Sequence, residues 1–199
     1  MTFRIGLTGS IGMGKSTTAQ MFADEGIPVW SADEAVHRLY RSGQPAAVAL
    51  GALFPTAMDE GGGVDRQRLR ALIAADASVL DKVNAVVHPL VQADRAAFLD
   101  RHLAQDIVLL DIPLLFETGT QRDLDAIVVV SVPADEQRRR VRARGMTDAE
   151  IDMILSRQMP DAEKRTRADH VIVTTSLDAA RAAVKDILHK VRQGVAKDA

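Results

Sequence analysis

The stretch that most constrains the fold is a glycine-rich turn, GSIGMGKS, at residues 9–16. It fits the pattern G-x-x-x-x-G-K-[ST] in full, with the apolar run Ile5 to Thr8 before it and a helical pattern after it. Glycines permit positive φ angles, so successive N–H groups can face a phosphate at the positive end of the following helix. The turn therefore predicts a phosphate-binding loop between a buried strand and a helix. Its order of glycines, G-x-x-G-x-G, disfavours a dinucleotide-binding loop.

A parallel sheet is predicted from runs of β-branched and apolar residues that do not alternate with polar ones. Ile107 to Leu110 and Ile127 to Val132 share this pattern with Ile5 to Thr8, and Pro28 to Trp30 and Val171 to Val173 are shorter candidates. Helical patterns that end at glycine alternate with these runs: Lys15 to Glu25, Ala134 to Arg144 and Leu177 to Arg192. The alternation indicates an α/β fold with about five strands.

Between Asp33 and Gln105 the strand signal disappears, and helical pieces are punctuated by SGQP, FPTAMDEGGG and HP. A loop of this length is disfavoured, so we expect an inserted helical lobe, with one of its helices capped by Asp65. Further along, TDAE at residues 147–150 has the pattern of a capping box and predicts a helix that runs to about Gln158, before Pro160.

Composition excludes several classes of function. The formal net charge of −2 provides no basic field for nucleic acid or an anionic membrane, and the absence of cysteine rules out disulfides and thiolate chemistry. The longest apolar stretches are too short to cross a bilayer, and no export signal is recognisable at the N-terminus. We expect a cytoplasmic protein that is folded throughout, apart from the tail after Gly194.

Three acidic residues follow predicted strands, where ligands bind in parallel sheets: Asp33, Asp111 and Glu117. If a phosphoryl group passes from ATP to an alcohol, a carboxylate near the hydroxyl can orient it and accept its proton. Asp33 and Asp111 both suit this role, although each also suits a helix cap or a solvated strand end. Asp111 further suits a position near Mg²⁺, with Ser16 as the hydroxyl ligand and Lys15 bridging the β- and γ-phosphates.

The run EQRRRVRARG at residues 136–145 is rich in arginine. On a helix, Gln137, Arg140 and Arg144 share one face and Arg138 and Arg142 another. A charge run is usually a solvated face, but this one also suits a mobile flap that brings guanidinium groups to the γ-phosphate.

With the loop, the Asp33 strand end, NAVVHPLV, LLDIPLLFE and DEQRRRVRAR in this order, the chain resembles the dephospho-CoA kinase family over almost its full length. The resemblance implies ATP-dependent phosphorylation of the ribose 3′-hydroxyl of dephospho-CoA, the last step of coenzyme A synthesis. It also implies a three-layer P-loop kinase fold with a five-stranded parallel sheet in the order 2-3-1-4-5. The implied core covers residues 1–33, 105–135 and 168–199, the acceptor-binding lobe 34–104 and the lid 136–167, in a monomer or weak oligomer.

Site residues are carried over from the family by matching position. Asp33 resembles the general base, with Lys15 and Arg140 also catalytic. Binding of ATP is implied for Gly12, Met13, Gly14, Lys15, Ser16, Thr17, Arg140 and Arg144, with Mg²⁺ at Ser16 and Asp111. Binding of dephospho-CoA is implied for Asp33, Arg66, His88, Pro89, Leu114 and Glu117. For His88 a helix cap is an equally open interpretation, and for Arg66 the alternative is a salt bridge.

Two positions depart from the family pattern. Ser31 stands where the first aspartate of Asp-Ala-Asp is common, and Thr174 stands where an asparagine near the adenine is usual. Two other classes remain open. A shikimate-like kinase usually has a Gly-Gly-Arg element, but here Gly63 leads to Val64. A regulatory GTPase would need an N-K-x-D guanine reader, which the sequence lacks.

Overall fold

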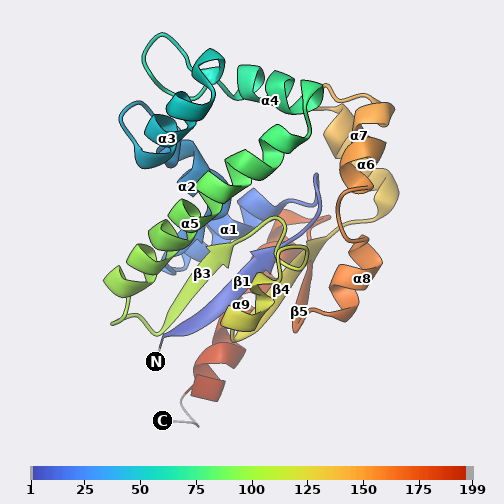
Figure 1. Cartoon of the computed structure of the whole chain (residues 1–199). Helices are drawn as coiled ribbons and strands as arrows, with labels where there is room; N and C mark the ends of the chain where they lie inside the picture. The colour runs from blue at the N-terminus through green and yellow to red at the C-terminus, as the bar shows by residue number, and fades with distance from the viewer. Residues whose placement is uncertain (1, 196–199) are drawn as a thin grey trace. The chain divides into compact units, whose positions relative to one another are not determined.

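The computed structural model describes residues 2–195, which form two compact units (Figure 1). Of these, residues 2–30 and 102–195 belong to one unit, and Ser31–Arg101 form the other. No helix within the described residues is both long enough and apolar enough to cross a membrane. The expected unfolded tail falls mainly on residues 196–199, which lie outside the described part of the chain.

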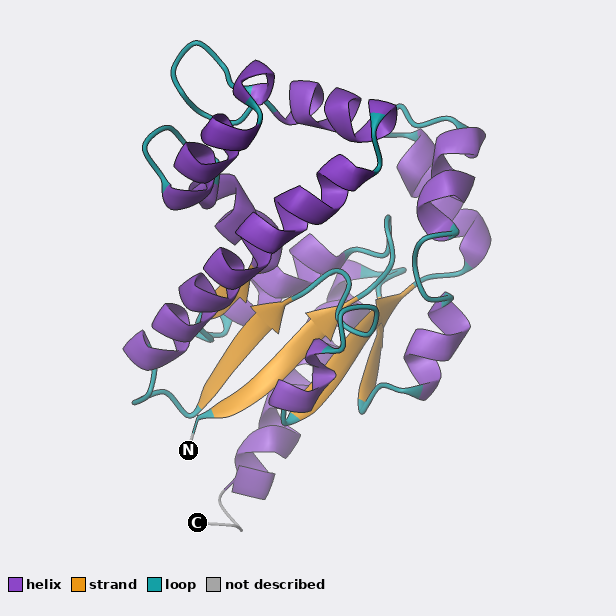
Figure 2. Ribbon diagram, viewed as in Figure 1, coloured by secondary structure: helices purple, strands orange, loops and turns teal. Residues whose placement is uncertain are grey.

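The first unit is built on a five-stranded parallel sheet, which confirms the predicted fold (Figure 2). The strands are β1 (Phe3–Thr8), β2 (Val29–Ser31), β3 (Ile107–Asp111), β4 (Ala126–Ser131) and β5 (His170–Val173), in the order β2-β3-β1-β4-β5. Only the last residue of β2, Ser31, is counted with the second unit. Every residue of β3 and β4 is buried, as expected of strands covered on both faces. Asp111, expected just beyond the third strand, is its last residue.

Helices of the same unit connect and cover these strands. They are α1 (Lys15–Asp24), η2 (Thr120–Asp123), α6 (Ala134–Arg142), α7 (Asp148–Leu155), α8 (Asp161–Thr166) and α9 (Leu177–Val195). Helices α1 and α9 contact each other, and apolar side chains of both, including Phe22 and Leu188, form one core with Leu7 and Val130 of the sheet. On the other face, a Cβ added to Gly6 would lie 2.3 Å from Leu124, so the strand there admits only glycine without displacing its neighbour.

The second unit is helical, with α2 (Ala32–Leu39), α3 (Pro45–Leu53), η1 (Pro55–Ala57), α4 (Arg66–Ala75) and α5 (Ser78–Arg101). The interpretation of HP as a break between helices is wrong, because α5 continues through Pro89. Proline has no N–H, so the carbonyl of Ala85 lacks its helical donor, a loss of about 3 kcal/mol. Burial of Val79, Val83 and Val87 in the core of this unit offsets that loss.

Other helix boundaries differ from the predicted ones. α6 ends at Arg142, so Arg144 lies beyond it, and α9 continues through Gly194. α8 had no counterpart in the pattern of apolar residues, since its sequence DAEKRT is almost entirely polar. Asp65 caps α4, and Thr147 and Glu150 form the capping box that starts α7, both as predicted.

Candidate active site

The phosphate-binding loop connects β1 to α1 and has the predicted backbone geometry. Gly12 and Gly14 have φ angles of 79° and 88°, in the left-handed region that favours glycine. α1 has no side-chain cap, and its first intrahelical bond runs from Thr18 N to the Gly14 carbonyl. The N–H groups of residues 15–17 precede this bond and have no acceptor within the helix. The loop therefore offers an anion the positive end of α1.

Lys15 points to the end of β3. Its Nζ lies 2.6 Å from Oδ1 of Asp111, and the two side chains are only 13% and 6% exposed. The next two side chains of the loop, Ser16 and Thr17, are exposed. The structure thus brings together the predicted phosphate-binding lysine and the predicted metal carboxylate.

Two glutamines of the predicted lid contact the loop, and sequence reasoning did not assign them to the site. Gln137 Nε2 donates to the Ile11 carbonyl at 2.7 Å, and Ile11 N donates to Gln158 Oε1 at 3.3 Å. Gln137 is buried, which is unusual for a glutamine on a helix rich in charge. Its place on the same helical face as Arg140 was the only signal in the sequence.

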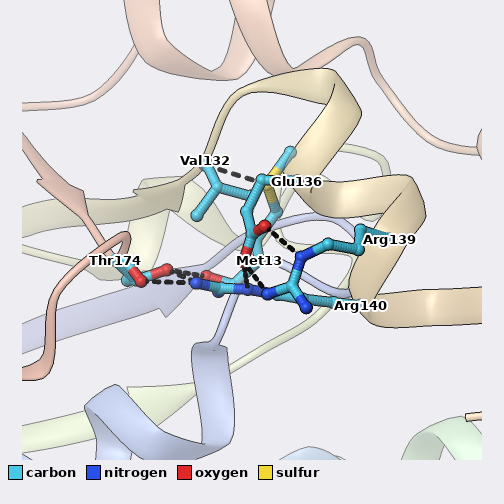
Figure 3. A network of polar contacts seen from close by, with 6 residues as sticks. All are labelled: Met13, Val132, Glu136, Arg139, Arg140 and Thr174. Carbon is cyan, nitrogen blue, oxygen red and sulfur yellow. Dashed lines mark hydrogen bonds and ion pairs between the residues drawn. The ribbon is translucent and has the colours of Figure 1, made fainter. Parts of the chain in front are cut away.

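Arg140 is held in a network that reaches the loop (Figure 3). Its Nε donates to Glu136 Oε1 at 2.6 Å, and its two terminal nitrogens donate to the hydroxyl and the carbonyl of Thr174. Thr174 in turn donates its hydroxyl proton to the carbonyl of Met13 at 2.7 Å. Hydrogen bonds from Arg139 and then Arg140 lower the pKa of Glu136 to about 2, so this carboxylate stays ionised in neutral solution.

The other arginines of the run lie at the surface. Arg138 pairs with Asp152 at 2.5 Å and Arg142 with Asp148 at 2.8 Å, so these two tie α6 to α7. Arg144 is exposed just after α6. The interpretation of the run as a solvated face fits Arg138 and Arg142. Among the arginines of the run, Arg140 is the one linked through Thr174 to the phosphate-binding loop.

Glu117 follows the turn after β3 and is engaged within the protein. Its Oε1 accepts from Met159 N at 2.8 Å and pairs with Lys164 Nζ at 2.9 Å. Burial alone would raise the pKa of Glu117, but the hydrogen bonds from Lys164 and Met159 outweigh it and hold the pKa below its usual range. Lys164 is fully buried. Leu114, in the same turn, is 41% exposed.

Asp33 lies in the first turn of α2 and is exposed. The helix cap is Ser31, whose hydroxyl accepts from Glu34 N, so the alternative interpretation of Asp33 as the cap is wrong. Asp33 makes no hydrogen bond or ion pair with another described residue. Ser31, which departs from the family pattern, therefore serves as the N-cap of α2, and the carboxylate of Asp33 is exposed to solvent.

A cavity of about 310 Å³ lies within the helical unit. His37, Tyr40, Arg41, Asp59 and Arg66 are among the residues that line it. The Arg66 guanidinium lies 5.9 Å from the centroid of the Tyr40 ring, a cation–π distance. Within the described residues, neither Arg41 nor Arg66 pairs with a carboxylate, so the salt-bridge interpretation of Arg66 is wrong.

His88 and Pro89 are exposed in the middle of α5. A helix cap at His88 is excluded, because residues on both sides of it belong to the same helix.

The parallel sheet order and the complete loop after the central strand define a P-loop kinase. The family model described as dephospho-CoA kinase matches residues 3–179. A dephospho-CoA kinase of Cereibacter sphaeroides is 56% identical over 192 residues, 96% of each chain, and one of Ruegeria pomeroyi is 55% identical over 195 residues, 98% of each chain. The chain belongs to the dephospho-CoA kinase family.

Solved structures share the fold. The crystal structure of TT1252 from Thermus thermophilus has a TM-score of 0.84 at 37% identity and covers 95% of this chain and 97% of its own. Dephospho-CoA kinase from Campylobacter jejuni has a TM-score of 0.72 at 24% identity, with 98% and 99% covered, and shows the shared fold. A shikimate kinase from Acinetobacter baumannii, at 17% identity and a TM-score of 0.51 with 98% and 95% covered, shares the fold alone.

Proposed function

We propose that this chain transfers the γ-phosphoryl group of ATP to the 3′-hydroxyl of dephospho-CoA, giving coenzyme A and ADP. Family membership over nearly the full chain supports the reaction, and the complete phosphate-binding loop with Lys15 at its helix start supports the donor. In this reaction the hydroxyl oxygen attacks the γ-phosphorus and the bond to the β,γ-bridging oxygen breaks. Catalysis of such a transfer rests on positioning and charge stabilisation.

The loop is proposed to hold the phosphates of ATP through Gly12, Met13, Gly14, Lys15, Ser16 and Thr17. The N–H groups at the start of α1 face the anion, and Lys15 supplies the positive charge for the β- and γ-phosphates. The loop cannot accept a side chain at Gly14, because a Cβ there would lie 2.9 Å from Thr174 Oγ1 on a backbone with φ of 88°.

Mg²⁺ is proposed to bind at Ser16 and Asp111. Magnesium in phosphoryl-transfer sites is held by one or two protein oxygens together with substrate phosphates and water, and one hydroxyl with one carboxylate fits that donor set. The described residues contain no cluster of three or more acidic or histidine side chains that would indicate an all-protein cage. When bound, the metal would neutralise charge on the phosphates.

Asp33 is proposed as the base that accepts the proton of the 3′-hydroxyl. Two observations favour it over Asp111. The carboxylate of Asp33 has no partner among the described residues, whereas that of Asp111 is committed to Lys15 at 2.6 Å. The cap of α2 is supplied by Ser31, so Asp33 is not needed for the helix. An exposed and uncommitted carboxylate is free to contact a substrate hydroxyl.

The cavity of the helical unit is proposed to take the anionic part of the acceptor. Dephospho-CoA carries a diphosphate, and Arg41 and Arg66 present guanidinium groups without carboxylate partners. His88, Pro89 and Leu114 are proposed to contact the acceptor, since all three are exposed. The contacts of Glu117 with Lys164 and Met159 support an indirect role, in which it shapes the turn that carries Leu114.

The lid is proposed to contribute Arg140 and Arg144 to ATP binding. Arg140 is the better supported, because the network through Thr174 joins it to the carbonyl of Met13 in the loop. Arg144 is exposed and lies outside α6, so it contributes to ATP binding only if the lid moves when ATP binds.

The proposal is tested with purified protein, ATP, Mg²⁺ and dephospho-CoA, with ADP release and the mass of the product as readouts. Coenzyme A is the matched control acceptor, because its 3′-hydroxyl is already phosphorylated. We expect ADP release when dephospho-CoA is the acceptor, and none above background when coenzyme A or shikimate replaces it. ADP release that is the same without dephospho-CoA would refute the proposal.

A further inference from the structure

Thr174, the first residue after β5, has used both of its donors inside the protein. Its N–H donates to the Ser131 carbonyl at 3.0 Å, and its hydroxyl donates to the Met13 carbonyl at 2.7 Å. The residue is buried. A threonine has no other proton to donate. The side chain therefore cannot act as a donor to a purine base, as an asparagine amide at this position could.

The acceptors of Thr174 are directed at Arg140. The threonine hydroxyl accepts from Nη1 of the arginine at 3.2 Å, and the threonine carbonyl accepts from Nη2 at 2.7 Å. Glu136 accepts from Nε at 2.6 Å. These bonds use three of the five guanidinium protons and leave one on each terminal nitrogen. Arg140 is thus held by Glu136 at Nε and by Thr174 at its two terminal nitrogens, and two of its N–H groups have no acceptor among the described residues (Figure 3).

We propose that Thr174 is a positioning residue for ATP, which fixes Arg140 against the phosphate-binding loop so that its two remaining N–H groups are oriented for the phosphates. This inference rests on the proposed contact between Arg140 and ATP. Without such support a long side chain loses conformational freedom when the ligand binds, which weakens binding. The hydroxyl of Thr174 contributes by joining Arg140 and Met13 at one oxygen atom.

The first test compares Thr174→Val, which removes the hydroxyl at nearly constant shape, with Thr174→Ser, which keeps it. Loss of a hydrogen bond to a charged group predicts ATP binding about tenfold weaker in the valine variant and within about twofold of wild type in the serine variant. Thr175→Val is the matched control, because Thr175 is the neighbouring threonine and is exposed. It is expected to bind ATP like the wild type.

A second readout separates positioning from base recognition. Because Thr174 acts through an arginine that contacts phosphates, Thr174→Val should weaken ATP and GTP binding by the same factor. A change in the ratio of the two affinities would overturn the inference, since it would mean that position 174 reads the base.

A double-mutant cycle shows whether Thr174 acts through Arg140. Affinities for ATP are measured by calorimetry for wild type, Thr174→Val, Arg140→Ala and the double variant, with melting temperatures alongside. In the Arg140→Ala background, we expect Thr174→Val to weaken ATP binding by less than about twofold. An equal loss in both backgrounds, no rescue by serine, or a lower melting temperature with unchanged ATP affinity would each overturn the inference. These measurements need no acceptor, so failure of the proposed phosphoryl transfer would be seen separately.

Discussion

Lys15 Nζ and Asp111 Oδ1 lie 2.6 Å apart, which joins the first residue of α1 to the last residue of β3. Both side chains are largely buried, so water screens the attraction between them only weakly. Asp111 therefore competes with the phosphates for Lys15, and Lys15 competes with Mg²⁺ for Asp111. We therefore expect nucleotide and metal to bind more tightly together than either does alone.

Asp111→Asn is expected to raise the Mg²⁺ concentration required for half-maximal activity and to lower kcat by about 10²-fold, because a charge at the phosphates is then poorly neutralised. Binding of metal-free ATP should be unchanged or tighter, since Lys15 is released from its partner. A magnesium titration of activity and calorimetry without metal test both points. Asp106→Asn, at an exposed aspartate just before β3, is the control. An unaltered Mg²⁺ requirement would remove Asp111 from the metal site.

Asp33→Asn is expected to lower kcat by about 10²–10⁴-fold through loss of the general base, while the Kd for ATP stays within about twofold. Stopped-time assays with saturating dephospho-CoA and direct ATP binding measure the two quantities. The neighbouring Glu34→Gln removes another exposed carboxylate of the same helix turn and is expected to leave kcat nearly unchanged. Equal losses in the two variants would point to a general effect of charge at the start of α2.

Arg66→Ala is expected to raise KM for dephospho-CoA about tenfold with little change in KM for ATP, because a charge-assisted hydrogen bond to the acceptor is lost. Initial rates at varied acceptor and fixed ATP provide the measurement. Arg70→Ala is the matched control, since Arg70 is an exposed arginine on the same helix and does not line the cavity. If both variants change KM for dephospho-CoA by the same factor, the cavity has no specific role in binding the acceptor.

Glu136→Gln is expected to change the dependence of stability on pH. The folded-state pKa of Glu136 is about 2 against an ordinary value of 4.5, so its ionised form stabilises the fold fully above pH 4.5 and progressively less as the pH falls toward 2. The difference in unfolding free energy between wild type and variant should therefore be largest at neutral pH and shrink through that window. Denaturant unfolding at pH 7, 4 and 3 provides the measurement. A difference that stays constant over these values would contradict the assignment.

Much of the first unit, which contains the sheet and the phosphate-binding loop, was predictable from local patterns. Apolar runs that do not alternate, such as residues 107–110 and 127–132, indicate strands covered on both faces, and all five predicted strands are present. The phosphate-binding loop is defined by eight consecutive residues, so its strand, turn and helix need no long-range information. Gly12 and Gly14 have the positive φ angles that the pattern requires.

Features that depend on tertiary contacts were not predictable in the same way. Pro89 suggests a break, but packing of the valines around it keeps α5 continuous. Lys164 lies in a polar stretch, where a lysine is expected to be exposed, yet it is buried and pairs with Glu117 from a distant turn. The bond from Thr174 to Met13 joins residues near opposite ends of the chain, and neither neighbourhood reveals the other.

The ion pair between Glu117 and Lys164 has a consequence for how the family diverges. Lys164 is fully buried, so loss of the Glu117 charge alone would strand an uncompensated cation, a cost of about 3–5 kcal/mol. An apolar replacement at both positions avoids that cost. Substitutions at 117 and 164 are therefore expected to co-occur among homologues. Such covariation would indicate the contact between the two positions, which the local sequence around either one does not predict.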